Sequence, residues 1–394
     1  PTPEAWGRVL ARDIVSTVHV PPEDNSAMDG YALRVADLAS GPGSVLRVSQ
    51  RIVAGRPGEP LQPGTAARIF TGAQVPAGAD AVVMQEHCEA VPGPALGSVR
   101  VNDVPAPGSA IRRQGEDVPL GHAVLRAGHR MDSAAIGLAA TVGMATLEVA
   151  ARPRVALFST GDELVMPGEP LPPGAIYNSN RFMLGALLRG QGCVVTDLGN
   201  VPDKLDATRA MLREAAAGHD LILSSGGVSV GEEDHLKPAL AAEGRLDLWA
   251  IAIKPGKPLA FGAVRHFGAD GVSRKGPDGP AETWFIGLPG NPVSSHVTFT
   301  LFVRPVLARL QGAEAAWPTG VPVRADFAWP RPDKRREFLR VRRNATGGLD
   351  LYANQGSGVL TSLAWGDGLA DLAPGQAVQP GDMVRFLSLA ELAP

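Results

Sequence analysis

Two lysines lie three positions apart in the loop Lys254-Pro255-Gly256-Lys257-Pro258. The two prolines fix the backbone on either side of the glycine, so a rigid loop should hold both ammonium groups near each other. The chain has only six lysines against 31 arginines, and lysine supplies a compact point charge where arginine supplies a planar fork. The pair therefore favours a site for a small tetrahedral oxyanion over two solvated surface lysines.

Four glycine-containing turns each follow a predicted strand, at 160–163, 225–234, 254–258 and 288–292. Glycine lets backbone N–H groups approach an anion closely, and a following helix N-terminus adds partial positive charge. Taken singly, each turn could be a linker, a helix cap or a simple turn. Since the carboxyl ends of parallel strands meet at one edge of a sheet, together they predict a site for a phosphate-bearing ligand.

Carboxylates form a second set of candidates. Glu163 and Asp234 lie in two of these turns, and Asp203 follows a further predicted strand. Asp29 and Asp117 lie in polar stretches that have no structural role beyond capping or turning. Carboxylates that converge near phosphates hold Mg²⁺ or act as a general base, although each of these could singly be a surface residue.

The stretch 331–343 is strongly basic, and Arg340 and Arg342 would lie on one face of a strand. It is either part of a binding surface or a solvated edge strand whose charges prevent aggregation. These two interpretations are equally supported by the residues alone.

Three regions should position these residues. Short apolar runs broken by glycine and proline predict β-strands within 1–150, together with a helix at 132–142 capped by Asp132 or Ser133. Within 151–312, apolar runs alternate with helical patterns, including a long helix from about 292 to 310, which predicts a mostly parallel sheet covered on both faces. Residues 313–394 are typical of a small all-β domain.

Composition limits the function. A chain of 394 residues with 44% hydrophobic residues should form two or more folded domains. A net charge of −3 disfavours non-specific nucleic-acid binding, and no apolar run is long enough to cross a membrane. Two widely separated cysteines fit a reducing cytosol. There is no P-loop, and the single match to a nucleophile elbow, Gly-Val-Ser-Val-Gly at 227–231, lacks an evident acid and histidine.

Seven motifs together resemble a known family. In chain order they are DNSAMDGYA (24–32), TGAQVPAGADAVVMQE (71–86), RRQGED (112–117), FSTGDEL (158–164), SSGGVSVGEEDH (224–235), IKPGKPLAFG (253–262) and GLPGNPVS (287–294). They resemble the MoeA family of molybdopterin molybdenumtransferases, which includes the E domain of gephyrin. The similarity covers essentially the whole chain.

The resemblance implies a multidomain α/β plus β fold. A linkage domain would comprise 1–20 and 122–150, an inserted β-rich domain 21–121, an α/β molybdopterin-binding domain 151–312 and a C-terminal β-barrel 313–394. It further implies an elongated homodimer with its active cleft at the subunit interface. The implied reaction inserts molybdate into adenylylated molybdopterin and, with Mg²⁺, releases AMP and molybdenum cofactor.

The resemblance also implies roles for individual residues. Molybdate would be bound by Lys254, Lys257, Pro258, Arg340 and Ser357. The functional carboxylates would be Asp29, Asp117, Glu163, Asp203 and Asp234, with Mg²⁺ held by Glu163, Asp203 and Asp234. The remaining substrate would be bound by Thr71, Thr160, Gly161, Ser225, Gly226, Gly227, Ser229, Gly231, Pro289, Gly290 and Asn291. Family members often have aspartate where this chain has Asn178, which is therefore left out of the catalytic set.

Two other functions stay open at this point. The α/β region is also similar to molybdopterin adenylyltransferases, and gephyrin's E domain serves as a non-catalytic scaffold. The main interpretation implies a cytoplasmic protein that receives its substrate from a molybdopterin adenylyltransferase and delivers cofactor to molybdoenzymes or their chaperones. It implies no nucleic-acid partner and no membrane.

Overall fold

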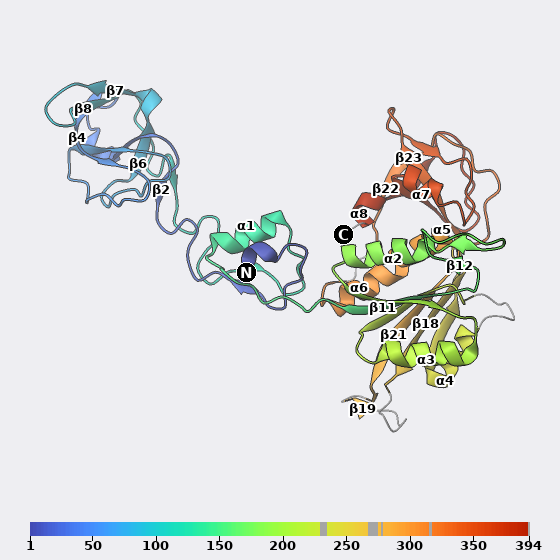
Figure 1. Cartoon of the computed structure of the whole chain (residues 1–394). Helices are drawn as coiled ribbons and strands as arrows, with labels where there is room; N and C mark the ends of the chain where they lie inside the picture. Colours follow the sequence, from blue (N-terminus) through green and yellow to red (C-terminus); the bar gives the residue numbers. More distant parts are fainter. Residues whose placement is uncertain (229–234, 267–274, 277–278, 315–316, 393–394) are drawn as a thin grey trace. The chain divides into compact units, whose positions relative to one another are not determined.

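The computed structural model describes residues 1–228, 235–266, 275–276, 279–314 and 317–392. The chain divides into two compact units (Figure 1). Unit 1 comprises Pro1–Trp6 and Leu10–Glu148, and unit 2 comprises Gly7–Val9 and Val149–Pro394. Within the described residues, none of the helices is both long enough and apolar enough to span a membrane.

Unit 1 is built around a six-stranded sheet with the order β6-β3-β5-β4-β8-β7. Its strands are β3 (Gly30–Leu33), β4 (Ser44–Ile52), β5 (Thr65–Ile69), β6 (Ala81–Met84), β7 (Cys88–Val91) and β8 (Ser98–Val101). Side chains of β4 are alternately buried and exposed over most of its length, as expected for a strand with one face on the core. The short strands expected from the broken apolar runs are thus confirmed.

Smaller elements complete unit 1. Two antiparallel pairs join β1 (Ile14–Val15) to β10 (Ala123–Leu125) and β2 (Asn25–Ser26) to β9 (Ile111–Arg112). The 3-10 turns are η1 (Thr2–Glu4), η2 (Val35–Asp37) and η3 (Gln85–His87). Helix α1 (Ser133–Thr141) begins where the sequence predicts, because the Asp132 carboxylate accepts a hydrogen bond from the Ala135 N–H at 2.8 Å.

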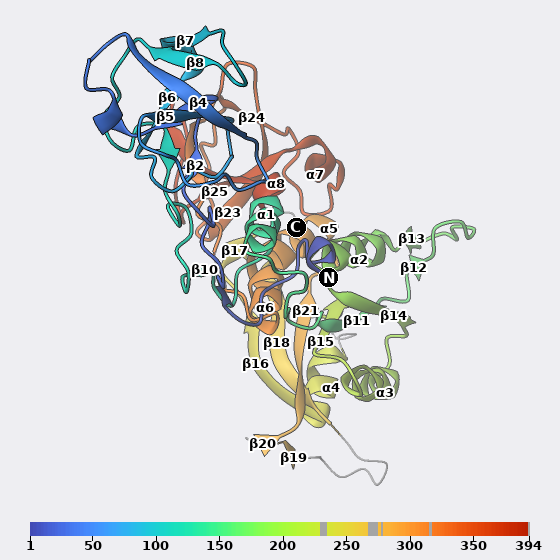
Figure 2. The same cartoon turned by 90° about the vertical axis from the view of Figure 1, so that its left-hand side faces the viewer.

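Unit 2 contains a second six-stranded sheet with the order β14-β11-β15-β21-β18-β16 (Figure 2). Its strands are β11 (Arg154–Thr160), β14 (Val194–Val201), β15 (Leu221–Ser225), β16 (Gly244–Ala250), β18 (Pro258–Arg265) and β21 (Glu282–Leu288). The first four in the sheet order run parallel, whereas β18 is antiparallel to both of its neighbours. A short antiparallel pair joins β19 (Lys275–Gly276) to β20 (Gly279–Pro280). A short parallel pair joins β12 (Leu164–Val165) to β13 (Ile176–Tyr177).

Helices cover both faces of this sheet (Figure 1). One apolar cluster joins the sheet to α3 (Leu205–Ala216) and α4 (Leu236–Glu243). A second cluster joins the opposite face to α2 (Ser179–Gly190) and to the helical segment that follows β21. That segment is the predicted long helix, in which a π-helical turn (Phe299–Val303) separates α5 (Pro292–Thr298) from α6 (Arg304–Leu310).

The C-terminal residues form a third six-stranded sheet with the path β17-β23-β25-β26-β22 and β24 paired to β23. Its elements are β22 (Val321–Arg324), β23 (Arg336–Arg343), β24 (Leu349–Leu351), α7 (Thr361–Trp365), β25 (Gly368–Leu372), β26 (Met383–Ser388) and α8 (Leu389–Leu392). Strand β17 (Ile253–Lys254) is contributed by the lysine loop and lies against β23. Since β23 is paired on both sides, the edge-strand interpretation of the basic stretch is wrong.

A buried ion-pair network connects α3 to α4. The Glu243 carboxylate, which has no exposed surface, accepts hydrogen bonds from Arg209 at 2.7 Å and from Arg213 at 2.6 and 2.9 Å. Burial by itself would raise the pKa of Glu243, but the bonds from Arg213 and Arg209 outweigh it and hold the pKa below its usual value. The stabilisation that these ion pairs give to the fold is therefore fully present above the usual pKa of glutamate. It is lost as the pH falls through the lowered pKa of Glu243.

We expect the double variant Arg209→Met/Arg213→Met to lose about 3 kcal/mol of unfolding free energy at neutral pH, because a buried carboxylate is left without a partner. Adding Glu243→Gln should recover part of that loss. Urea unfolding combined with hydrogen exchange of the α3 and α4 amides would measure both. Arg12→Met is the control, since its pair with Glu148 is exposed and should contribute less than about 1 kcal/mol. Equal losses in the control and the double variant would contradict this account.

Candidate active site

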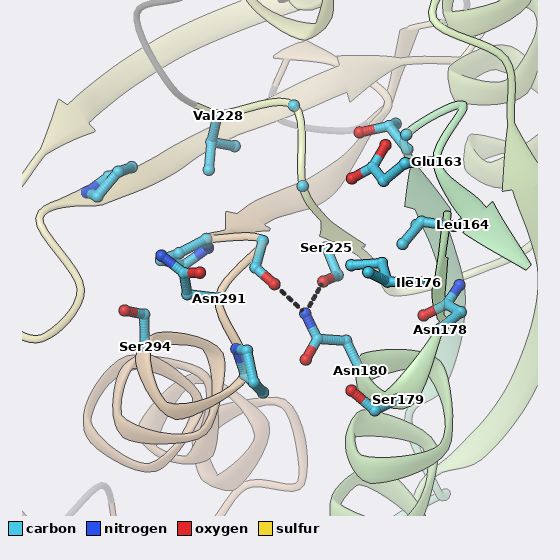
Figure 3. Close-up of a pocket in the computed structure, with 18 of the residues that line it drawn as sticks. Glu163, Leu164, Ile176, Asn178, Ser179, Asn180, Ser225, Val228, Asn291 and Ser294 are labelled. Carbon is cyan, nitrogen blue, oxygen red and sulfur yellow. Dashed lines mark hydrogen bonds between the residues drawn. The ribbon is translucent and has the colours of Figure 1, made fainter. Parts of the chain in front are cut away.

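A cavity of about 470 Å³ lies where β11, β15 and β21 of unit 2 end (Figure 3). This is the edge at which the glycine-containing turns were expected to converge. Eleven predicted residues line it: Thr160, Gly161, Glu163, Asp203, Ser225, Gly226, Gly227, Pro258, Pro289, Gly290 and Asn291. The cavity is within the size range of small-molecule sites.

The backbone around this cavity is tightly packed. Gly226 and Gly227 have positive φ angles of 89° and 65°. A Cβ atom on Gly226 would lie 2.6 Å from the Thr160 carbonyl oxygen, and one on Gly227 would lie 2.7 Å from Thr160 Oγ1. Only glycine permits the turn after β15 to approach the end of β11 so closely.

Asn180 connects the strand-end turns (Figure 3). Its Nδ2 donates to Ser225 Oγ at 2.8 Å and to the Gly290 carbonyl at 2.7 Å. The side chain is 7% exposed and comes from the first turn of α2. One amide thus holds the turn after β15 against the turn after β21, a role that the sequence analysis did not assign to it.

Three buried polar atoms of cavity-lining residues have no hydrogen-bond partner among the described residues: Thr160 Oγ1, Asn178 Nδ2 and Asn180 Oδ1. Asn178 is only 2% exposed, and its Oδ1 caps α2 by accepting from the Arg181 N–H at 3.1 Å. Leaving a buried donor or acceptor unpaired costs about 1–3 kcal/mol, so such groups are uncommon in folded proteins. All three atoms belong to residues of the cavity wall, but the atoms themselves are shielded from solvent.

The sequence analysis did not assign to the site any of the cavity-lining residues from β13 and the start of α2. These residues are Ile176, Tyr177, Asn178, Ser179 and Asn180, and further unpredicted lining comes from Leu164, Val228, Pro292 and Ser294. The available signal was the position of Asn178 as a helix cap, which places the helix N-terminus at the cavity.

The acidic side of the cavity carries Glu163 and Asp203. Burial and, after it, the negative charges of Asp162 and Glu163 raise the pKa of Asp203. A divalent cation would relieve this repulsion, so the carboxylates present are chemically suited to Mg²⁺. Even so, no group of three His, Cys, Asp or Glu side chains close enough to bind a metal occurs in the described part of the chain. The third predicted ligand, Asp234, lies outside that part, as do Ser229 and Gly231.

The structure gives the two lysines of the loop different surroundings. Lys254 Nζ lies 3.1 Å from the Glu337 carboxylate and 3.5 Å from that of Asp333, both from the C-terminal region. Glu337 is 1% exposed and is itself fixed by bonds from Trp329 Nε1 and the Asp333 N–H. Lys257 is exposed and has no ion-pair partner among the residues described. Lys257 therefore has the ammonium group that is available to an anion.

Arg340 and Ser357 do not line the cavity. The Arg340 side chain is 1% exposed and donates to Ser362 Oγ, the Phe338 carbonyl and the Gly356 carbonyl, all within 3.2 Å. Burial lowers the pKa of Arg340 to about 10. The Ser357 carbonyl accepts from the Val293 N–H at 3.0 Å, so this segment is joined to the first turn of α5, beside the cavity.

Three predicted residues belong to unit 1. Asp29 Oδ1 accepts bonds from both the N–H and the hydroxyl of Thr71, each at 2.8 Å. The Thr71 N–H and then its hydroxyl are the main causes that lower the pKa of Asp29, which keeps it ionised. Asp117 is exposed. The expected roles of these residues in the reaction stay predictions.

Three family models match successive parts of the chain. Residues 1–143 match the MoeA N-terminal region (domain I and II), 156–309 a probable molybdopterin-binding domain, and 322–389 the MoeA C-terminal region (domain IV).

Individual proteins are similar over most of their length. A molybdopterin molybdenumtransferase of Haemophilus influenzae is 42% identical over 78% of this chain and 72% of its own. One of a Nostoc species is 38% identical over 98% of this chain and 87% of its own. The crystal structure of the molybdopterin biosynthesis MoeA protein of Pyrococcus horikoshii aligns with a TM-score of 0.82 at 27% identity, covering 98% of this chain and 93% of that one. The expected fold class is confirmed, and the chain belongs to the MoeA family.

Proposed function

We propose that this protein is a molybdopterin molybdenumtransferase, which inserts molybdate into adenylylated molybdopterin and releases AMP and molybdenum cofactor. The observation that carries the proposal is the cavity at the ends of β11, β15 and β21, with its glycine-containing turns, the N-terminus of α2 and its adjoining carboxylates. The names of relatives that align over nearly the whole chain support the same activity.

The cavity would bind the pterin part of the substrate and its phosphates. Its wall combines polar side chains and glycine backbone with apolar groups such as Leu164 and Val228, which suits a heterocycle that carries polar groups. The N-terminus of α2 lies at the same cavity and favours negative charge there. Ser225, held by Asn180, fixes the shape of the site before the ligand arrives.

Molybdate would bind beside Lys257. The substrate is a dianion, so it needs a cation that is free of carboxylates, and Lys254 is already paired with Glu337. We infer that Lys254 mainly holds the loop against the C-terminal region and that Lys257 supplies the direct charge. Pro258, which lines the cavity, would place the loop next to the bound pterin.

The acidic residues would act on the bond between the two phosphates. Glu163 and Asp203, with Asp234, would hold Mg²⁺, which would neutralise charge on this pyrophosphate linkage. One of these carboxylates, or Asp29 or Asp117, would act as the base that accepts the proton of the water or of the protonated molybdate oxygen that attacks phosphorus. The phosphorus–oxygen bond to the adenylate then breaks, and AMP leaves.

A homodimer in the cytoplasm would fit this role. Its substrate would come from a molybdopterin adenylyltransferase, and its product would pass to molybdoenzymes or their chaperones. The decisive experiment titrates adenylylated molybdopterin and molybdate and measures AMP. Consumption of ATP with molybdopterin alone would instead favour an adenylyltransferase, and absence of AMP release with intact ligand binding would favour a scaffold.

Lys257→Met should reduce molybdate-dependent AMP release at least about 100-fold, because removing a charge that stabilises the reacting oxyanion costs several kcal/mol. Binding of adenylylated molybdopterin, measured by calorimetry, should persist. Lys334→Met, at an exposed lysine of the C-terminal region, is the matched control and should retain activity. Unchanged AMP release in Lys257→Met would remove the lysine loop from the mechanism.

Asp203→Asn should lower AMP release roughly 100-fold, the usual scale for losing a positioned acid–base or metal-binding group. The pKa of Asp203 is raised, so the fold prefers its neutral form, and ionisation above the usual aspartate pKa costs stability. Asp203→Asn should therefore unfold at a higher urea concentration than wild type at pH 7, with the gain vanishing at acidic pH. Asp206→Asn, an exposed change in the first turn of α3, should do neither. An Asp203→Asn variant that is less stable than wild type and fully active would contradict both the expected loss of AMP release and the expected gain in stability.

A further inference from the structure

A second cavity, of about 500 Å³, lies in unit 1. One wall is the hairpin formed by β7 and β8, with Val91 and Leu96 among its apolar contributions. The other wall is formed by β3, β4 and β5 of the same sheet, which contribute Tyr31, Arg51 and Arg68. We call it the arginine pocket. None of its lining residues is among those that the resemblance assigned to the reaction.

The cations of the arginine pocket are held on aromatic rings. The Arg51 guanidinium lies 4.6 Å from the centre of the Phe70 ring, and that of Arg68 lies 4.7 Å from the same ring. Arg68 is also 5.1 Å from the Tyr31 ring. Such contacts stabilise a guanidinium by about 0.5–2 kcal/mol and fix its plane.

The charge of the pocket is only partly compensated, because Arg68 is near enough to the Asp29 carboxylate to help lower its pKa. No carboxylate is found among the residues that line it. Arg68 donates to the Gly30 carbonyl at 3.0 Å and to Gln85 Oε1 at 2.7 Å, which orient it without neutralising it. Arg51 has no hydrogen bond or ion pair within the described part of the chain.

Other arginines of unit 1 vary in their surroundings. Five of them form ion pairs with carboxylates, namely Arg12, Arg34, Arg100, Arg113 and Arg126. Arg51 has no such partner in the described part of the chain, and with Arg68 it gives this cavity a local positive potential. Arg51 can present paired N–H groups to the oxygens of an anion, and Arg68 those N–H groups that Gly30 and Gln85 leave free.

We propose that the arginine pocket binds the phosphate of an organic phosphate about the size of a mononucleotide. The phosphate would accept hydrogen bonds from Arg51 and Arg68, and the apolar hairpin wall would cover the organic part. The cavity volume is within the range of sites for such ligands. This binding function is separate from the proposed reaction, because its residues lie in unit 1 and its test does not depend on catalysis.

Site-resolved chemical protection tests the proposal on the full chain. Phenylglyoxal modifies accessible arginines, and peptide mass spectrometry follows the rate at each one. AMP or pyrophosphate at millimolar concentration should slow modification of Arg51 at least fivefold. Arg47, an exposed arginine on the same strand β4, is the internal control and should react at an unchanged rate. Adenosine, which lacks the phosphate, should not protect, and malonate should protect much less than pyrophosphate.

Two variants separate this site from the cleft of unit 2. Lys257→Met should leave the protection of Arg51 intact. Phe70→Leu, which removes the ring between the two guanidinium groups, should weaken protection several-fold while circular dichroism shows an unchanged fold. Absence of protection at 10 mM AMP and pyrophosphate, or equal slowing of Arg51 and Arg47, would overturn the proposal. Equal protection by malonate would also overturn the assignment to phosphate.

Discussion

Three parallel strands that end at one edge of a sheet determine where the polar groups of the cleft can lie. Strands β11, β15 and β21 are adjacent and in register, so Thr160, Ser225 and Leu288 reach the edge together. The turns that follow cannot spread apart, because Asn180 holds the second turn to the third and Gly227 packs on Thr160. The same constraint keeps Thr160 Oγ1 and Asn180 Oδ1 from finding partners within the protein. Buried polar atoms without partners break the usual packing rules, and such exceptions are expected at functional sites.

Local signals in the sequence predicted much of the fold. The cap at Asp132 predicted α1, and the helical pattern predicted the segment 292–310, both close to their observed bounds, since these features act within a few residues. The glycine-containing turns after β11, β15 and β21 likewise predicted the edge at which the cavity lies. These predictions needed only the rule that parallel strands end on the same side of a sheet.

Long-range pairing could not be predicted in this way. The lysine loop contributes β17 to the C-terminal sheet, where Lys254 is opposite Glu337 in register. Glu337 is far away in sequence, and nothing near Lys254 indicates that its charge is neutralised. The two lysines therefore looked equivalent, and only their tertiary surroundings distinguish them. Asn178 was left out because an amide stands where relatives often have aspartate, and its place at the cavity follows only from the tertiary fold. Asn180 was missed because nothing near it in sequence shows that it reaches Ser225 and Gly290.

The two anion sites argued for this chain use different cations because they face different geometric demands. In unit 2, the proposed oxyanion would need a single charge at the end of a flexible stem, and Lys257 would supply it from a loop stiffened by Pro255 and Pro258. In unit 1, a phosphate at an open cavity needs several directed donors, and Arg51 and Arg68 provide them only because Phe70 fixes their planes. Exchanging the residue types would remove the advantage at both sites: a lysine on Phe70 would lose the paired N–H groups, and an arginine at 257 would require more space and a fixed approach direction. The scarcity of lysine in this chain is thus consistent with its use where a point charge, rather than a fork, is required.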